Sequence, residues 1–156
     1  RTQVETVIAT GLKPTHLDSH CHIHIRRKDI FEMTSSLSKE YGIALRVGSR
    51  EFIDSLRKQG FPTDDHSTLD SYRLETRDKP VLYPKLLREL PPGLSEWAIH
   101  PGIGDEELKS IMPDWEVRQA DFDFFTSKEA REIVEEENIN IISYRPLLDA
   151  WERIRY

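Results

Sequence analysis

The histidine-rich stretch HLDSHCHIH, residues 16–24, constrains this chain more than any other segment. It holds four of the six histidines, and histidine or aspartate occupies every second position. Successive side chains of a β-strand point to opposite faces, so the alternation predicts a strand with one polar and one largely apolar face. Because neutral imidazole is the commonest metal ligand, the polar face indicates a metal or substrate site. The alternative is a polar strand edge with solvated histidines.

The predicted strand covers residues 15–20. It would place His16, Asp18 and His20 on the same side and bring the last three histidines together at its C-terminal end. A single strand cannot surround one ion with five groups. We therefore expect two or three of them to reach the ion and the others to bind substrate or orient a ligand.

The composition argues against nucleic-acid and membrane partners. Charged residues make up 32% of the chain and the formal net charge is −6, which disfavours binding to a nucleic-acid backbone. No apolar run approaches the roughly 20 residues of a membrane-spanning helix. Cys21 is the only cysteine, which rules out an internal disulfide and favours a cytoplasmic location.

The order of apolar runs predicts the fold class. Strand-like and helical segments alternate, which is typical of β/α units and a mostly parallel sheet. We count about four strands, among them residues 43–47 and 139–144, too few to close an eight-stranded barrel. The 156 residues suit one domain, so we predict a single α/β domain over 1–156: a distorted or partial (β/α) barrel. Function is expected at the C-terminal ends of its strands, where residues 20–24 and His100 are predicted to lie.

Local signals place several helices. One is expected near residues 30–40 and ends at Gly42, with a buried stripe of Ile30, Met33, Leu37 and Tyr41. Ser127 caps another helix, and a terminal helix is expected over residues 148–154. Trp97 is expected in the core.

One further segment has the composition of a metal site. Asp64, Asp65 and His66 follow one another in a stretch rich in turn residues. The other interpretation is a polar loop near the sugar site.

Taken together with the histidine stretch, three further segments make the chain resemble the YdjC-like carbohydrate deacetylases. They are GIALR (42–46), LPPGLSEWAIHPGIGDEEL (90–108) and FFTSKEAREIVEEENINIISY (124–144). The resemblance runs through residues 1–148. It implies a distorted (β/α) barrel and a divalent metal ion, Mg²⁺ or Zn²⁺. The implied reaction removes acetyl groups from N-acetylated amino sugars such as chitooligosaccharides.

The resemblance also implies roles for residues that contact metal or substrate. His20 matches the metal-binding histidine of the family. His22 and His24 match its neighbouring active-site histidines and are expected to contact the substrate. Arg46 matches a basic residue at the next strand end, where it would hold a sugar hydroxyl or the oxyanion. An ordinary ion pair is the alternative for Arg46.

Proton transfer is expected from two further residues. His100 matches the histidine of the family's His-Pro segment and is expected to be the general acid, with Glu96 orienting it within the substrate site. Asp18 is a fallback catalytic base or an orienter of histidine. The alternative for His100 is a turn cap.

The sequence departs from the family pattern in one respect. Family members begin with a strand that carries an Asp-Asp pair, followed by another histidine, and this sequence has no counterpart. Because the sequence begins at Arg1 inside an expected helix, we expect the missing groups to come from an upstream segment of a parent chain or from a second copy. The competing hypotheses are a metal-dependent (β/α) phosphoesterase and a non-catalytic remnant that binds a sugar or a partner.

Overall fold

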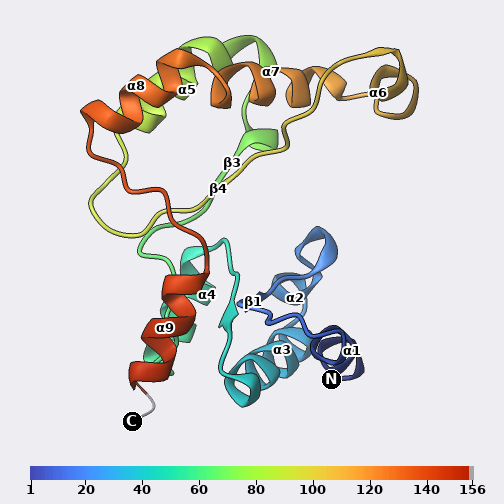
Figure 1. The fold of residues 1–156 in the computed structure, drawn as a ribbon, viewed down its shortest axis with the longest axis vertical. Helices are drawn as coiled ribbons and strands as arrows, with labels where there is room; N and C mark the ends of the chain where they lie inside the picture. Colours follow the sequence, from blue (N-terminus) through green and yellow to red (C-terminus); the bar gives the residue numbers. More distant parts are fainter. Residues whose placement is uncertain (155–156) are drawn as a thin grey trace. The chain divides into compact units, whose positions relative to one another are not determined.

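The structure is a computed structural model that describes residues 1–154, and the chain divides into two compact units (Figure 1). Unit 1 consists of residues 1–67 and the C-terminal segment that starts at Ile142, whereas unit 2 consists of residues 68–141. The chain therefore leaves unit 1, forms unit 2 and then returns to unit 1. The single domain expected from the length stays a prediction.

Unit 1 combines one pair of short parallel strands with helices. Residues opposite each other in the pair are His16 and Ala44, and Leu17 and Leu45. Parallel strands need a long crossover connection, and two helices supply it. In chain order the elements are α1 (Thr2–Ala9), β1 (His16–Leu17), η1 (His20–His22), α2 (Ile23–Arg26), α3 (Lys28–Tyr41), β2 (Ala44–Leu45), α4 (Arg50–Lys58) and α9 (Arg145–Ile154).

Helix α3 ends at the predicted residue but buries a different face from the predicted one. Gly42 adopts a left-handed φ of 66° and its N–H donates to the Ser38 carbonyl, which confirms the predicted end. The predicted stripe is wrong, because Met33 is 54% exposed whereas Phe31 and Ser38 are buried. The Phe31 ring packs against Phe52 of α4, with ring centroids 4.5 Å apart. This contact directs the face of α3 that carries Phe31 toward the core.

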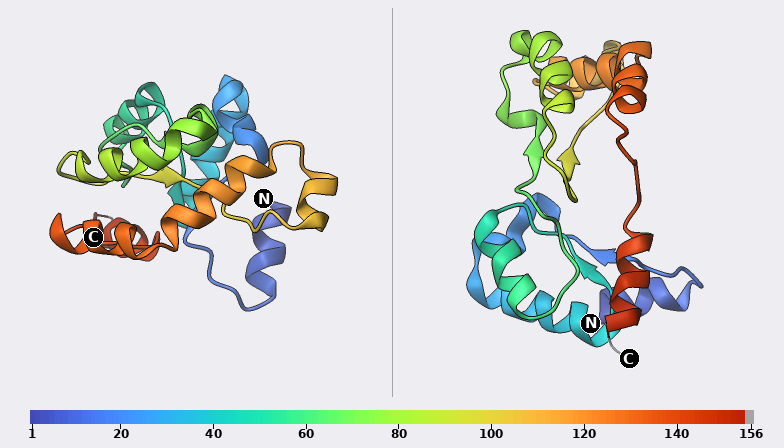
Figure 2. Two further views of the ribbon diagram at one scale, coloured as in Figure 1. Left: turned by 90° about the horizontal axis from the view of Figure 1, so that it is seen from above. Right: turned by 90° about the vertical axis from the view of Figure 1, so that its left-hand side faces the viewer.

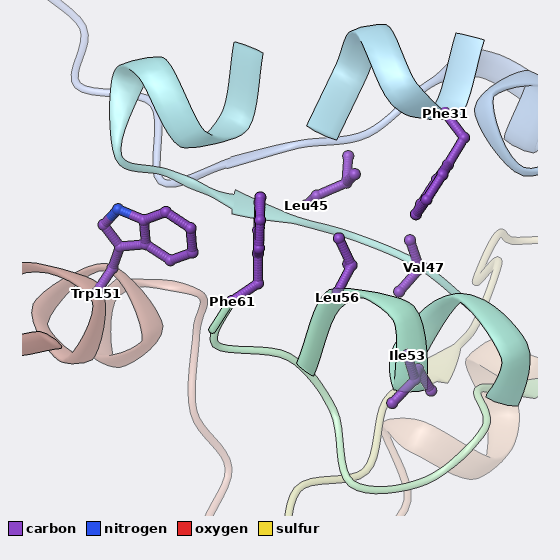
Figure 3. Packing of buried hydrophobic residues seen from close by; sticks show 7 residues of the cluster. All are labelled: Phe31, Leu45, Val47, Ile53, Leu56, Phe61 and Trp151. Atoms are coloured by element: carbon purple, nitrogen blue, oxygen red, sulfur yellow. The ribbon is translucent and has the colours of Figure 1, made fainter. Parts of the chain in front are cut away.

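The core of unit 1 lies between β2 and α4, and α9 contributes to it (Figure 3). Trp151 of α9 meets Phe61 edge-on, with ring centroids 4.6 Å apart. Ile53 and Leu56 are fully buried, and each such side chain contributes about 1.5–3 kcal/mol of stability. The seven residues of this cluster are Phe31, Leu45, Val47, Ile53, Leu56, Phe61 and Trp151.

Unit 2 also holds one pair of short parallel strands. Leu69 lies opposite Trp97, and Asp70 lies opposite Ala98. Helices α5, α7 and α8 pack against one another (Figure 1). In chain order the elements are β3 (Leu69–Asp70), η2 (Ser71–Arg73), η3 (Thr76–Asp78), α5 (Lys79–Arg88), β4 (Trp97–Ala98), α6 (Glu106–Ile111), α7 (Trp115–Phe125) and α8 (Lys128–Glu136).

Aromatic rings fill the core of unit 2. The buried Tyr83 ring lies 5.3 Å from the rings of Trp97 and Phe124. Trp97 packs against this cluster, which confirms its predicted place. Ser127 caps α8 as predicted, because its hydroxyl accepts a hydrogen bond from the Ala130 N–H at 3.0 Å.

The fold is mixed α/β and mostly helical, with short parallel strands. The parallel pairing is confirmed, but the described residues form two separate two-stranded pairs and do not show a barrel. The strand predicted over 139–144 is wrong, since this segment is irregular (Figure 2). Its Ile141 is 80% exposed. An extended segment needs a neighbouring strand to pair with, and the described residues offer it none.

The terminal helix is confirmed as α9. Within residues 1–154, no helix has the length and apolar character needed to cross a membrane.

Candidate functional site

The predicted site residues lie in two clusters, one in each unit. The first, which we call the histidine turn, comprises residues 18–24 and the adjoining Arg46 at the end of β2 in unit 1. The second, the His100 loop, comprises residues 100–104, which begin two residues after the end of β4 in unit 2. Because each cluster belongs to a different unit, each is described by itself.

The histidine turn is a strained reversal and not a continuous strand. Regular strand stops at Leu17, and a short 3₁₀ turn and helix α2 follow. Cys21 and His22 adopt left-handed φ angles of 52° and 53°. Left-handed backbone costs a non-glycine residue roughly 1–2 kcal/mol. The predicted alternation of His20, His22 and His24 on one face is therefore wrong, whereas strained backbone of this kind is a common property of functional sites.

Burial increases along the three histidines at the end of the turn. His20 is exposed, His22 is half-buried and His24 is fully buried. Their different exposure indicates different tasks, although the sequence spacing made them look equivalent.

His24 ties the turn to the end of β2. Its Nε2 lies 2.7 Å from the Arg46 carbonyl, which can only accept, so Nε2 carries the proton. Its Nδ1 then accepts from the Ser19 hydroxyl. Both ring nitrogens are used within the protein, and these contacts favour a positioning role. The predicted contact of His24 with substrate stays a prediction.

Asp18 and Arg46 form an ion pair beside this turn. Arg46 Nη1 lies 2.8 Å from Asp18 Oδ2, and the Ser19 N–H donates to Oδ1 at 2.7 Å. Partial burial opposes ionisation of Asp18, but the hydrogen bonds from Arg46 and Ser19 outweigh it and hold its pKa below the usual value. An ionised carboxylate with a low pKa is a weak proton acceptor, so this geometry favours an orienting role over a catalytic base.

The described residues do not complete a metal site. Among them, no three histidine, cysteine or carboxylate side chains lie close enough together to hold a metal ion. A catalytic zinc site typically has three protein ligands. His20 is exposed, but the described residues do not assemble around it the donor set required to hold an ion.

The acidic pair that has the composition of a metal site is held by arginines. The Asp65 carboxylate forms an ion pair with Arg57, which also donates to the Asp64 carbonyl at 2.9 Å. Arg50 donates to the Asp65 carbonyl at 3.0 Å. This segment is a polar loop held by α4, which confirms the loop, whereas its place near the sugar site stays a prediction.

One aromatic contact of unit 1 joins residues far apart in the sequence. The His16 and Tyr144 rings stack with centroids 4.0 Å apart and planes inclined by 14°. Nothing in the local sequence around Tyr144 marks it as a partner of the histidine stretch, so sequence reasoning missed it.

In unit 2, the His100 loop is hydrogen-bonded along helix α7. The backbone N–H groups of His100, Gly102 and Gly104 all donate to groups of this helix. Their acceptors are Asp121 Oδ2 at 2.7 Å, the Arg118 carbonyl at 3.1 Å and Gln119 Oε1 at 2.6 Å, respectively. The loop therefore has a defined path along α7.

Gly104 is required by the close packing of the loop. A Cβ atom at this position would lie 2.6 Å from the Trp115 ring, which is closer than non-bonded carbon atoms approach. The glycine allows the loop to lie directly on α7.

The ring of His100 meets a second aromatic residue at the same edge of the strand pair. Tyr72 and His100 each come two residues after the end of a strand, β3 and β4 respectively. Because the strands are parallel, their carboxyl ends coincide, and the rings meet edge-on with centroids 4.6 Å apart. The predicted place of His100 at a strand end is confirmed, whereas no sequence signal marked Tyr72.

Glu96 lies at the opposite end of β4 from His100. Its backbone carbonyl accepts from the Leu69 N–H at 2.9 Å, within the pairing of β3 and β4. The Asp121 carboxylate accepts from the backbone N–H of His100, and nothing in the sequence marked Asp121 as its partner. The predicted role of Glu96 in orienting His100 stays a prediction.

Comparison with known proteins identifies the relatives of this chain. Residues 1–136 match the YdjC-like protein family. A carbohydrate deacetylase of Clostridium beijerinckii is 27% identical over 150 residues, which are 94% of this chain and 59% of that protein. A chitooligosaccharide deacetylase of Escherichia fergusonii is 51% identical over 37 residues, which cover 24% of this chain and 14% of that protein.

A solved structure extends the similarity to the fold. It is a crystal structure described as a putative cellobiose-phosphate cleavage protein of Enterococcus faecalis, 27% identical, with a TM-score of 0.68. The similarity covers 93% of this chain and 57% of that one, so the chain spans less than two thirds of the length of these relatives. On the family match and this shared fold, the chain belongs to the YdjC-like family.

Proposed function

We propose that the protein carrying this chain removes the N-acetyl group from an acetylated amino sugar or chitooligosaccharide, with a divalent metal ion as cofactor. The observation that carries this proposal is the family match over residues 1–136, since relatives at 27% identity are carbohydrate deacetylases. Because the chain spans about 57–59% of those relatives, the reaction of a whole protein is part of the proposal.

The chemistry is the hydrolysis of an amide. A water oxygen bonds to the acetyl carbonyl carbon, the C–N bond breaks, and the departing amine takes a proton. Histidine is the residue that most often supplies such a proton. We assign this task to His100, which lies at a strand end with its backbone fixed by Asp121. The products are acetate and the free amino sugar.

A bound divalent ion supplies a polarised carbonyl and an activated water in hydrolases of this kind. His20 is the ligand that we assign from this chain. Since the described residues provide no complete donor set, the proposal includes ligands from outside them, either on a further segment of a longer protein or on a second copy.

Substrate contacts are assigned to the polar groups beside the histidine turn. Arg46 carries five N–H donors, and its pairing with Asp18 at 2.8 Å orients the guanidinium for a sugar hydroxyl. His22 is half-buried on strained backbone, which supports a contact with the substrate. His24 fixes the turn through Ser19 and the Arg46 carbonyl.

Acetate release from N-acetylglucosamine oligomers tests the proposal. We expect the complete protein to release acetate, to stop when a chelator is added, and to resume when Mg²⁺ or Zn²⁺ is restored. His20→Ala should abolish metal binding and turnover. His66→Ala is the matched control, because His66 belongs to the loop braced by α4 and should leave metal affinity unchanged. Acetate release that is indifferent to chelator, or His20→Ala with full metal affinity, would contradict the proposal.

His100→Gln separates proton transfer from metal binding. Metal affinity should stay unchanged while kcat falls roughly 10²–10⁴-fold, the usual contribution of a general acid. A kcat that stays within a factor of two would remove His100 from the mechanism.

A phosphoesterase is the second candidate function. The solved relative from Enterococcus faecalis is described by the cleavage of cellobiose phosphate, a phosphorylated sugar, and Arg26, Arg27 and Lys28 follow the histidine turn. However, Arg27 and Lys28 form ion pairs with Asp29 and Glu32, which weakens the case for a phosphate pocket. Release of inorganic phosphate from a sugar phosphate without acetate release would favour this candidate.

A further inference from the structure

We propose that Asp121 is the positioning residue for His100, and that its carboxylate links the backbone of the His100 loop to the buried core of unit 2. This inference rests on the proposed function, because it is His100 that is assigned as the proton donor. Asp121 itself does not touch substrate and acts through the loop.

The two oxygens of the Asp121 carboxylate have separate partners. Oδ1 accepts from Lys79 Nζ at 3.0 Å and from the Tyr83 hydroxyl, both on helix α5. Oδ2 accepts from the His100 N–H at 2.7 Å. One oxygen therefore fixes the carboxylate to α5, and the other fixes the residue that follows β4. This side chain therefore joins His100 to the helical core, next to the backbone contacts that Gly102 and Gly104 make with α7.

Burial makes this link rigid. Asp121 and Tyr83 are fully buried and Lys79 is 1% exposed, so water does not compete for these hydrogen bonds. Hydrogen bonds to a charged group contribute more to stability than neutral ones. The His100 N–H is held by the strongest kind of acceptor that a side chain provides.

A purely structural ion pair would not need the contact with His100. A buried lysine–carboxylate pair can be replaced by apolar residues of similar volume with little loss of stability, so stability alone is a weak reason for it. The carboxylate also reaches out of the helical core to a strand end, where it meets the loop that Gly102 and Gly104 hold against α7. This placement points to a task in fixing the loop.

Hydrogen exchange of the 156-residue chain tests the link without any assay of activity. In the unmodified chain, the His100 amide should exchange slowly although the residue is half-buried, and an NMR coupling across the hydrogen bond should join its nitrogen to the Asp121 carboxyl carbon. In Asp121→Asn, the amides of the His100 loop should exchange roughly 10- to 100-fold faster.

Two comparison variants separate positioning from general loss of stability. Tyr83→Phe removes a donor to the same carboxylate but leaves the bond to His100, so it should weaken the core without accelerating exchange in the His100 loop. Glu116→Gln makes the same carboxylate-to-amide change as Asp121→Asn, but on an exposed face of α7. It should alter neither the stability of the core nor the exchange of the His100 loop.

Kinetic measurements on the complete protein test the effect of Asp121 on catalysis. Asp121→Asn should lower kcat about 100-fold with KM changed by less than a factor of three, because a misplaced general acid impairs the chemical step more than substrate binding. The pH profile of kcat should move as well, whereas Tyr83→Phe should keep the unmodified profile.

The outcomes distinguish the two proposals. If the His100 amide of the unmodified chain exchanges rapidly and shows no coupling to Asp121, the positioning role is wrong, whatever the activity. If Asp121→Asn and Tyr83→Phe change loop exchange equally, Asp121 is only a core residue and the inference fails. If the exchange results hold but the complete protein releases no acetate, the proposed function fails while the link between Asp121 and His100 stands.

Discussion

Each unit contains an aspartate paired with a basic side chain next to a candidate site residue, but in very different surroundings. In unit 1, the side chains of Asp18 and Arg46 are 36% and 17% exposed. In unit 2, those of Asp121 and Lys79 are 0% and 1% exposed. The first pair borders water, so Arg46 can keep its contact with Asp18 and still offer its other N–H donors to a ligand. The second pair cannot separate without leaving a buried charge unpaired.

The difference shows how similar chemistry can serve opposite purposes. A partly exposed arginine that an aspartate orients retains N–H donors for a sugar hydroxyl. A buried carboxylate that accepts three hydrogen bonds is suited to holding other groups still. The contrast leads to four predictions.

The largest effect is expected for Lys79→Met, which keeps most of the side-chain volume but removes the charge. It leaves the Asp121 carboxylate buried and unpaired, so the free energy of unfolding should fall by about 3–5 kcal/mol. Urea denaturation followed by circular dichroism measures this change. Lys128→Met is the control, since Lys128 is 86% exposed in its pair with Glu132 and its loss should change stability by under about 0.5 kcal/mol. A Lys79→Met protein as stable as this control would show that burial does not make the Asp121–Lys79 pair costly to break.

Removing a tyrosine hydroxyl should also cost more stability in the buried surroundings of unit 2 than on the surface of unit 1. Tyr83→Phe removes a buried hydrogen bond to Asp121 and should lower the free energy of unfolding by about 1.5–3 kcal/mol. Tyr41→Phe removes a solvent-exposed hydrogen bond to Glu5, 3.1 Å long, and should lower it by less than about 0.5 kcal/mol. Thermal unfolding of both variants against the parent chain measures the difference, and equal losses would show that burial does not govern these bonds.

Acid should lower the stability of both units, but salt should affect the contributions of their aspartates differently. Burial opposes ionisation of Asp121, but hydrogen bonds from Tyr83, His100 and Lys79 outweigh it, so its pKa lies below the ordinary 3.8. The pKa of Asp18 is lowered as well. A carboxyl group with a lowered folded-state pKa stabilises the fold fully above about pH 3.8 and loses that contribution as the pH falls through the folded value.

Stability measured between pH 5 and pH 2, with and without 1 M NaCl, tests this expectation. Salt should reduce the contribution of Asp18 and leave that of Asp121 largely unchanged, because buried charges are screened less. The variants Asp18→Asn and Asp121→Asn separate the two contributions. A salt effect of the same size on the contributions of Asp18 and Asp121 would contradict the expected difference between a partly exposed and a buried pair.

The smallest effect on stability is expected for Arg46→Met. Loss of a partly exposed ion pair should change the free energy of unfolding by about 0–1 kcal/mol. In the complete protein, the same variant should raise KM for the acetylated sugar more than it lowers kcat. Arg131→Met, a change on an exposed face of α8, should alter neither stability nor KM. A stability loss above about 2 kcal/mol for Arg46→Met would mean that the pair is structural.

The sequence was most informative where a local signal determines the structure. Gly42 ends α3 and Ser127 starts α8, because backbone geometry and capping depend on neighbouring residues alone. The parallel pairing and the place of His100 at a strand end were also predictable, because the alternation of elements and the strand-end rule do not require knowledge of packing.

The features that could not be predicted depend on contacts between residues far apart in the sequence. The histidine stretch was read as a strand because neither Cys21 nor His22 carries a signal for left-handed backbone, as a glycine would. Asp121 was missed because it lies 21 residues from His100 in an aromatic-rich helix, where an aspartate looks like a solvent-facing residue. Only the fold brings these residues to their partners.

The discontinuity of unit 1 has a consequence for biosynthesis. Phe61 is synthesised early, but its partner Trp151 emerges 90 residues later. At typical translation rates of about 5–20 residues per second, the aromatic surface of unit 1 stays uncovered for roughly 5–20 s. Unit 2 is continuous and is finished first. The nascent chain thus exposes an apolar surface on the ribosome, where a chaperone has time to bind before α9 arrives.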